Sequence, residues 1–144
     1  VPGTPLPMLE DPGAARDDSL WSPRSRGVWR VPVLVDGRAR VFLTVEATSS
    51  GLDAVDFGGA DLAREIGELE PARRGSREAL LRLDRLGCDI LIVDRHGRGF
   101  AEGEFVPLRS ARSRFASDST VFRSRKALGR AVRRVQSEPG RGER

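Results

Sequence analysis

Apolar residues in the first half of the chain follow the two-residue period of a β-strand in two neighbouring segments. In residues 31–35 (VPVLV) every second position is valine, and residues 41–45 (VFLTV) carry apolar side chains on both faces. The dipeptide Asp36-Gly37 between them is a strong signal for a two-residue hairpin turn. We therefore predict a β-hairpin whose second strand lies inside a sheet.

The spacing of apolar residues changes to that of a helix further along. Residues 47–51 (ATSSG) are polar and predict a loop. The following apolar residues fall on one face of a short helix that ends at Gly67. They are Ala60, Leu62, Ala63 and Ile66.

Three further strands are predicted before position 108. After a loop at residues 70–77, residues 79–86 (ALLRLDRL) favour a strand, with a helix between Ser76 and Gly87 as the alternative. Residues 88–94 (CDILIVD) have the composition of a buried strand. A turn at residues 96–99 then leads into a last strand that ends at Pro107.

The first 27 residues contain more than half of the nine prolines and few periodic apolar positions. This composition predicts an extended arm rather than a folded unit. Trp29 begins the first predicted strand, and we expect it in the core. Trp21 lies in the arm, where its indole can pack on its own domain or on a partner.

The last segment, residues 109–144, predicts a basic amphipathic helix. Its apolar stripe runs from Phe122 through Leu128 to Val135. Six cations surround this stripe: Arg123, Arg125, Lys126, Arg130, Arg133 and Arg134. Such a helix suits docking onto its own domain, a groove in another protein, a phosphate backbone or an anionic membrane surface.

The charge distribution agrees with a division into three parts. Residues 109–144 carry 11 Arg or Lys and 3 acidic residues, a net charge of +8, while residues 1–108 have a net charge of −4. We predict an arm at 1–27, a β-rich domain at 28–108 and a basic tail at 109–144. The fold class expected is mainly β with one short helix in the domain.

The segment 31–67 resembles the first half of retropepsin-like aspartic proteases. That family has a Val-Pro-Val strand, a turn, an apolar strand, a catalytic Asp-Thr/Ser-Gly loop and a short helix; residues 31–35, 41–45 and 62–67 (LAREIG) fit this frame. The resemblance implies a small retropepsin-like β-barrel or sandwich. It is also compatible with export, since many relatives of this scaffold are exported.

The catalytic motif of that family is lost here. Its loop positions fall on Glu46, Ala47 and Thr48, so the carboxyl group is displaced by one methylene, the bracing hydroxyl is missing and threonine replaces glycine. The resemblance therefore implies a pseudoenzyme with a degenerate active site. We predict no catalytic residues.

Cofactor chemistry has little support in the sequence. The chain has one cysteine and one histidine, Cys88 and His96, which make neither a disulfide nor a Cys/His metal cluster. The apolar context of Cys88 predicts a buried structural thiol. His96 is expected in an exposed turn. We predict no cofactor and no metal, and the longest apolar runs are too short for a transmembrane helix.

Three functional hypotheses follow. The first is a non-catalytic structural or binding subunit of a larger assembly, which docks through Trp21 of the arm and through the C-terminal helix. The helix contacts expected are Phe122, Arg123, Leu128, Arg130, Arg133 and Arg134. The second hypothesis is a nucleic-acid-associated protein that uses the basic tail. The third is a divergent aspartic peptidase with Glu46 as its acid.

Overall fold

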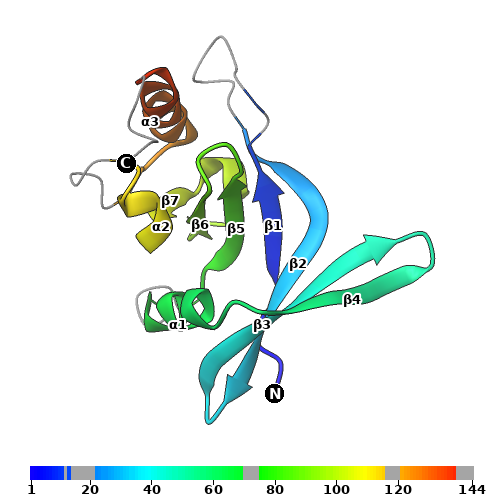
Figure 1. Ribbon diagram of the computed structural model, residues 1–144. Helices are drawn as coiled ribbons and strands as arrows, with labels where there is room; N and C mark the ends of the chain where they lie inside the picture. Colours follow the sequence, from blue (N-terminus) through cyan, green and yellow to red (C-terminus); the bar gives the residue numbers. More distant parts are fainter. Residues whose placement is uncertain (12, 14–21, 70–74, 116–120, 139–144) are drawn as a thin grey trace.

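The protein is mainly β. The computed structural model describes residues 1–11, 13, 22–69, 75–115 and 121–138, which form one seven-stranded mixed sheet with short helices on it (Figure 1). The strand order is β4-β3-β2-β1-β5-β6-β7, and all neighbours are antiparallel except β1 and β5. The strands are β1 (Leu6–Glu10), β2 (Arg24–Val35), β3 (Arg38–Thr48), β4 (Gly51–Gly58), β5 (Arg77–Leu83), β6 (Cys88–Asp94) and β7 (Glu104–Pro107). The helices are α1 (Ala60–Leu69), α2 (Arg109–Arg112) and α3 (Arg125–Ser137), with a 3-10 turn at Phe100–Glu102.

The predicted hairpin around Asp36-Gly37 is confirmed, as β2 and β3. Val35 pairs with Arg38 across the two-residue turn. Asp36 has φ 52° and Gly37 has φ 72°, and left-handed conformation at both positions matches the twist of the strands on either side. Both strands are longer than predicted, because β2 begins at Arg24 and β3 continues to Thr48.

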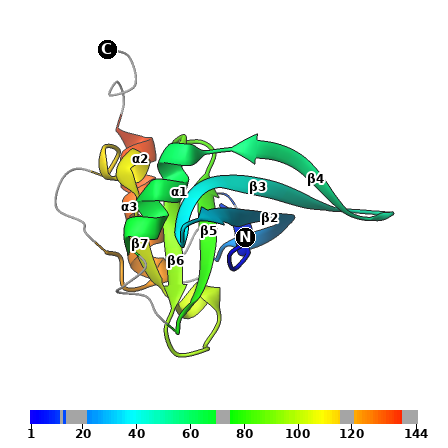
Figure 2. The same cartoon turned by 90° about the horizontal axis from the view of Figure 1, so that it is seen from below.

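The predicted loop at 47–51 is wrong. β3 continues through Ala47 and Thr48, only Ser49 and Ser50 form the turn, and the chain returns as β4. Strand β4 was missed because a β-bulge at Val55 interrupts its two-residue period: Thr44 pairs with Asp56, but the next residue, Val45, pairs with Ala54. Figures 1 and 2 show the β3–β4 hairpin extending well beyond the helices.

The N-terminal segment is not an arm outside the folded unit. Leu6–Glu10 forms β1 in the middle of the sheet, antiparallel to β2 and parallel to β5. Leu6, Met8 and Leu9 are buried there. The prolines around this strand are compatible with it because the pairing with β5 begins only at Met8, after Pro7. Even residues 1–3 follow β2, since Gly3 N–H donates to the Pro32 carbonyl at 2.7 Å.

The strand predictions for residues 79–86 and 88–94 are confirmed. β5 ends at Leu83 and β6 spans Cys88–Asp94, so the competing helix at residues 76–87 is wrong. The last strand is shorter than predicted, because Phe100 lies in the 3-10 turn and β7 begins at Glu104. β6 is buried along almost its whole length, as its continuous apolar sequence predicts.

Two apolar clusters hold the helices on opposite faces of the sheet. On one face, Ala63 and Ile66 of α1 pack with Phe42, Leu80 and Leu91. The other face of β5, β6 and β7 is covered from the C-terminal side of the chain. Its contributors are Ala111, Phe115, Phe122, Leu128, Ala131 and Val132.

The structure defines where the two longer helices begin and end. α1 continues two residues beyond the predicted end at Gly67. α3 begins after Ser124, whose hydroxyl accepts a hydrogen bond from the Ala127 N–H at 3.1 Å. Just before it, Phe122 forms two 2.8 Å backbone hydrogen bonds with Phe105 of β7. The described parts of the segment after 108 therefore pack into the core.

Candidate functional site

The residues at the degenerate catalytic position lie in a strand. Glu46, Ala47 and Thr48 are exposed residues of β3 that pair with Asp53, Leu52 and Gly51 of β4. They therefore do not form the loop that the resemblance implied. The Thr48 hydroxyl instead braces the hairpin tip: its oxygen lies 3.1 Å from the Gly51 carbonyl oxygen and 3.2 Å from Asp53 Oδ2, and its single proton can be donated to either.

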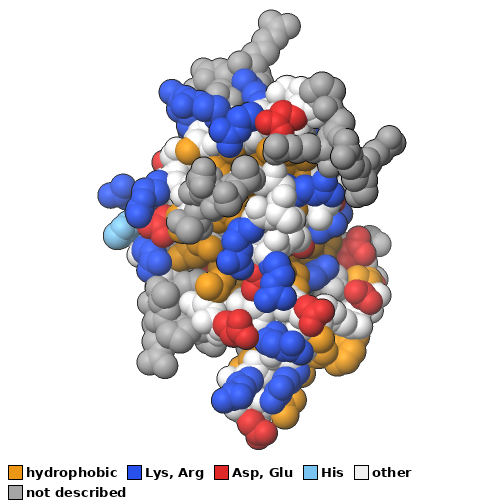
Figure 3. Space-filling view, turned by 60° about the vertical axis from the view of Figure 1, so that its left-hand side comes forward, with side chains coloured by type: hydrophobic (Ala, Val, Ile, Leu, Met, Phe, Trp, Pro, Cys, Tyr) orange, Lys and Arg blue, Asp and Glu red, His pale blue; other side chains and the backbone are white. Residues whose placement is uncertain are grey.

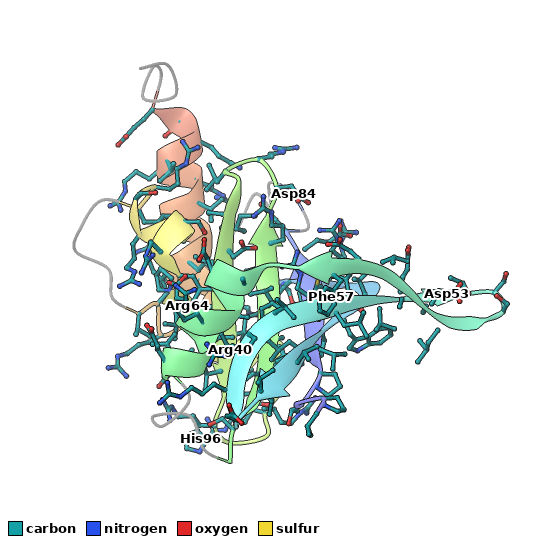
Figure 4. All side chains as sticks on the ribbon, turned by 60° about the horizontal axis from the view of Figure 1, so that its bottom comes forward. Arg40, Asp53, Phe57, Arg64, Asp84 and His96 are labelled. Carbon is teal, nitrogen blue, oxygen red and sulfur yellow. The ribbon has the colours of Figure 1, made fainter. Side chains whose placement is uncertain are left out.

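Glu46 and Asp53 do bring two carboxylates together, but on an open surface. Both side chains lie on the projecting hairpin, and Figure 4 shows Asp53 toward its tip. Acid pairs that share a proton and hold a water work inside an enclosed site of low dielectric. Glu46 and Asp53 are both exposed, so the hairpin supplies no such enclosure around them.

The other face of this hairpin is apolar. Because side chains alternate along a strand and paired residues share a face, the register defines one continuous surface across β2, β3 and β4. One row is Val31, Leu43 and Phe57, and the next is Trp29, Val45 and Ala54. We call the whole set the open sheet face: Trp29, Val31, Val33, Val41, Leu43, Val45, Ala47, Leu52, Ala54 and Phe57.

The open sheet face is accessible. Leu52 is 68% exposed and Phe57 is 64% exposed, and neither is enclosed by a neighbouring element. Trp29 is half-buried, so the expectation that it belongs to the core is wrong. The reason is positional: β2 and β3 turn the face that carries Phe42 toward α1, while Trp29 lies on the opposite face, which the helices leave open. Contiguous exposed apolar surface of this kind marks interaction sites.

An acidic row lies on the opposite side of the same hairpin. Asp56 pairs with Thr44 and Asp53 pairs with Glu46, so all three carboxylates share the face that carries Phe42 nearer the body. Among the residues that the structure describes, none forms an ion pair with these three. The hairpin thus presents an apolar side and an acidic side along one strand edge.

A cavity of about 520 Å³ lies between the N-terminal residues, the β2–β3 hairpin and α1. Its walls are largely apolar and include Pro32, Phe42 and Ile66. Among the described residues that line it, Arg77 and Glu78 are ionisable, and the Arg77 guanidinium lies 5.0 Å from the centre of the Phe100 ring.

The predicted contacts of the C-terminal helix separate into two groups. Phe122 and Leu128 are buried in the protein's own core, so their assignment to a partner surface is wrong. Their stripe was equally suited to docking on this domain, and that packing is observed. Arg123, Arg130 and Arg134 are exposed, and Arg133 is half-buried. Trp21, the contact predicted in the arm, lies outside the described residues.

Part of this positive charge is already compensated within the chain. Arg123 Nη1 lies 3.8 Å from Glu104 Oε1, and Arg125 Nη2 lies 3.8 Å from Glu102 Oε1. Arg112 pairs with Glu65 at 3.1 Å. In the view of Figure 3, Lys and Arg side chains are interspersed with Asp and Glu instead of forming one continuous patch.

Cys88 and His96 are placed as predicted. Cys88 is fully buried, and burial together with the neighbouring Asp89 charge raises the pKa of its thiol to about 11 despite Arg82 and Arg114. His96 is exposed in the turn after β6. That turn is organised by Asp94, whose Oδ1 accepts from the N–H groups of His96 and Arg98 and whose Oδ2 accepts from Gly99.

Asp94 is the one buried charged residue among those described. Burial alone would raise the pKa of its carboxyl, but the backbone N–H donors outweigh burial and lower the pKa below its usual value. The described residues contain no group of three or more potential metal ligands. No described helix has the length and apolarity that crossing a membrane requires.

The open sheet face was not found from the sequence, although part of its signal was present. Leu52 and Ala54 alternate with Asp53, but the bulge at Val55 shifts the pattern before Phe57. Comparison with known proteins adds no further assignment. The chain matches no model of a known protein family, no curated protein and no solved structure.

Proposed function

We propose that this protein is a non-catalytic binding subunit that docks onto another protein through the open sheet face. The observation that carries this proposal is the exposure of Leu52 and Phe57, at 68% and 64%, on a hairpin that projects from the body. Burying a side chain of this size contributes about 1.5–3 kcal/mol. A partner that covers the face therefore gains substantial binding free energy.

This docking site differs from the two that the sequence suggested, which were the N-terminal arm and the C-terminal helix. β1 and the apolar stripe of α3 are used within the chain's own core, whereas the open sheet face offers exposed apolar side chains to a partner. We retain a degenerate retropepsin-like ancestry as part of the proposal. Its support is the order of strand, Asp-Gly turn, strand and short helix in β2, β3 and α1, with β4 inserted before the helix.

Site-specific photocrosslinking tests this function. A photoreactive phenylalanine analogue replaces Phe57 in the full chain, and, as a control, replaces His96, which is exposed in the turn after β6 and away from the open sheet face. We expect one discrete protein adduct from position 57 in the native cells and none from position 96. The adduct should disappear when Leu52→Ser is added. Adducts of equal yield from both positions, or none from position 57, would refute docking through this face.

A second candidate function is nucleic-acid association through the exposed arginines Arg123, Arg130 and Arg134. Phosphate binding by such residues weakens steeply as the salt concentration rises, because binding releases counterions from the nucleic acid. Docking through an apolar face does not weaken in this way. Filter binding of a mixed-sequence duplex between 50 and 200 mM salt, with Arg130→Ala and Arg134→Ala, would distinguish the two functions. The divergent peptidase hypothesis requires that Glu46→Gln abolish acid-pH cleavage.

A further inference from the structure

We infer that the occupant of this docking surface is an extended peptide segment that pairs with the edge of β4 and alternates apolar residues with Lys or Arg. This inference rests on the proposed function and specifies the chemistry of the partner. It derives from three observations on the β3–β4 hairpin: a free strand edge, an apolar face on one side and an acidic face on the other.

The strand edge is available for pairing. β4 is an edge strand of the sheet, and within the described part of the chain it pairs only with β3. Seven of its eight residues are exposed, from Gly51 to Phe57. An exposed edge presents unpaired backbone N–H and C=O groups, and an extended peptide can satisfy them as an added strand.

The two faces of β4 determine which side chains such a strand needs. Side chains directly opposite each other on adjacent strands lie about 4.5–5.5 Å apart at Cβ. Alternate residues of the added strand would therefore meet Leu52, Ala54 and Phe57 on the open sheet face. The intervening residues would meet Asp53 and Asp56, with Glu46 behind them on β3. Apolar residues suit the first side and cations suit the second.

The same acidic row argues against a second copy of this chain as the occupant. In antiparallel pairing of two β4 strands centred between Ala54 and Val55, Asp53 of each copy would stand opposite Asp56 of the other. Other registers would still gather the carboxylates of both copies on one face. Like charges opposite each other destabilise a sheet, whereas Lys or Arg in those positions would be attracted. The bulge at Val55 also interrupts the regular edge and disfavours indiscriminate pairing.

The experiment measures binding of defined peptides to the full chain. The probe is a fluorescent ten-residue peptide in which valine and arginine alternate. A second peptide carries glutamate in place of arginine, and a third has the first sequence with alternate backbone amides methylated. The protein variants are Asp53→Lys/Asp56→Lys, Leu52→Ser/Phe57→Ser and, as a charge-reversal control at another exposed site, Asp61→Lys on α1. Circular dichroism verifies that each variant is folded.

We expect the arginine peptide to bind and the glutamate and methylated peptides not to bind. Asp53→Lys/Asp56→Lys should lower the affinity for the arginine peptide by on the order of tenfold or more and should create binding of the glutamate peptide. Asp61→Lys should leave the affinities for both peptides unchanged. Equal effects of Asp61→Lys and the β4 variant, or absence of binding, would overturn strand addition. Dimerisation that depends on Phe57, measured by sedimentation, would assign the edge to a second copy and also overturn it.

The failure of this inference can be told apart from failure of the proposed function. If no peptide binds but the crosslink from position 57 still depends on Leu52, docking on the open sheet face stands and the strand-addition mode is wrong. If the crosslink is also absent, both are wrong.

Discussion

Glu46 of β3 stands directly opposite Asp53 of β4, so the hairpin carries two carboxylates as a cross-strand pair on one face. Opposed like charges destabilise an antiparallel pair, and the described residues offer no cation in an ion pair with either group. A sequence shaped only by hairpin stability would have an opposite charge here.

Glu46→Lys should therefore make the protein more stable. An ammonium group opposite Asp53 replaces repulsion by attraction, and we expect the free energy of unfolding to rise by about 0.2–1 kcal/mol. Urea unfolding at low salt measures this, and high salt should reduce the gain. Asp61→Lys on α1 serves as a charge-matched control, and an equal gain from it would show that net charge, not the pair, is responsible.

Asp94 should control stability in acid. Its carboxylate accepts N–H groups of His96, Arg98 and Gly99, and Asp94→Ala leaves these donors without their acceptor, at a cost of about 1–3 kcal/mol. Because the folded-state pKa is lowered, the charge contributes stability above the unfolded-state pKa of about 3.9 and loses it as pH falls toward the folded value. As the pH is lowered from 7 to 2, the urea midpoint should fall less steeply in Asp94→Asn than in the parent protein. An unchanged pH slope would contradict this assignment.

The Cys88 thiol should be inert in the folded protein. With a pKa of about 11, on the order of one thiol in a thousand is ionised at pH 8, and the side chain is fully buried. We expect reaction with a disulfide reagent to be slow in buffer and rapid in urea. Fast reaction without denaturant would mean that β6 opens readily, since its neighbours in the core would have to separate.

Leu9 tests whether β1 belongs to the core. The side chain is 6% exposed and packs with Leu81 and Ile90, so Leu9→Ala should lower the free energy of unfolding by about 2–5 kcal/mol. Val35→Ala, at a half-exposed apolar position, should change it by less than about 1 kcal/mol. Equal effects of the two substitutions in urea unfolding would contradict the central position of β1.

The two sides of α3 should respond differently to truncation. Leu128 is fully buried, and we expect Leu128→Ala to destabilise the protein by about 2–5 kcal/mol. Lys126 is exposed on the same helix, and Lys126→Ala should stay within about 0.5 kcal/mol of the parent. Thermal unfolding of both variants measures the difference. A folded, fully stable Leu128→Ala variant would return Leu128 to the partner surface.

Local signals predicted several elements of the fold correctly. The Asp36-Gly37 turn fixes its own hairpin because both positions adopt φ values that these residues accept, and Cys88–Asp94 is apolar enough to be a buried strand in any context. The length and ends of strands were less predictable. They depend on neighbours, as in β3, which continues through the polar residues Glu46 and Thr48 because β4 pairs with it.

The central position of β1 and the open sheet face could not be read from the chain. Pro5 and Pro7 favour loop structure locally, whereas Leu6 and Leu9 are buried by residues far along the chain, among them Leu80 and Leu81, more than 70 positions away. Similarly, Phe57 and Trp29 are apolar residues whose exposure depends on which half of the sheet the helices cover. Such tertiary relationships override local pattern.

The place of β1 between β2 and β5 has a consequence for biosynthesis. β1 leaves the ribosome before the other strands of this sheet, yet its parallel neighbour ends at Leu83. Leu9, whose core neighbours all lie at position 79 or later, therefore stays uncovered until β5 has been made. Closing this long-range pair is an intrinsically slow step. The earliest strand of the sheet is thus completed late, and newly made chains present an apolar segment that is prone to aggregation until the sheet is joined.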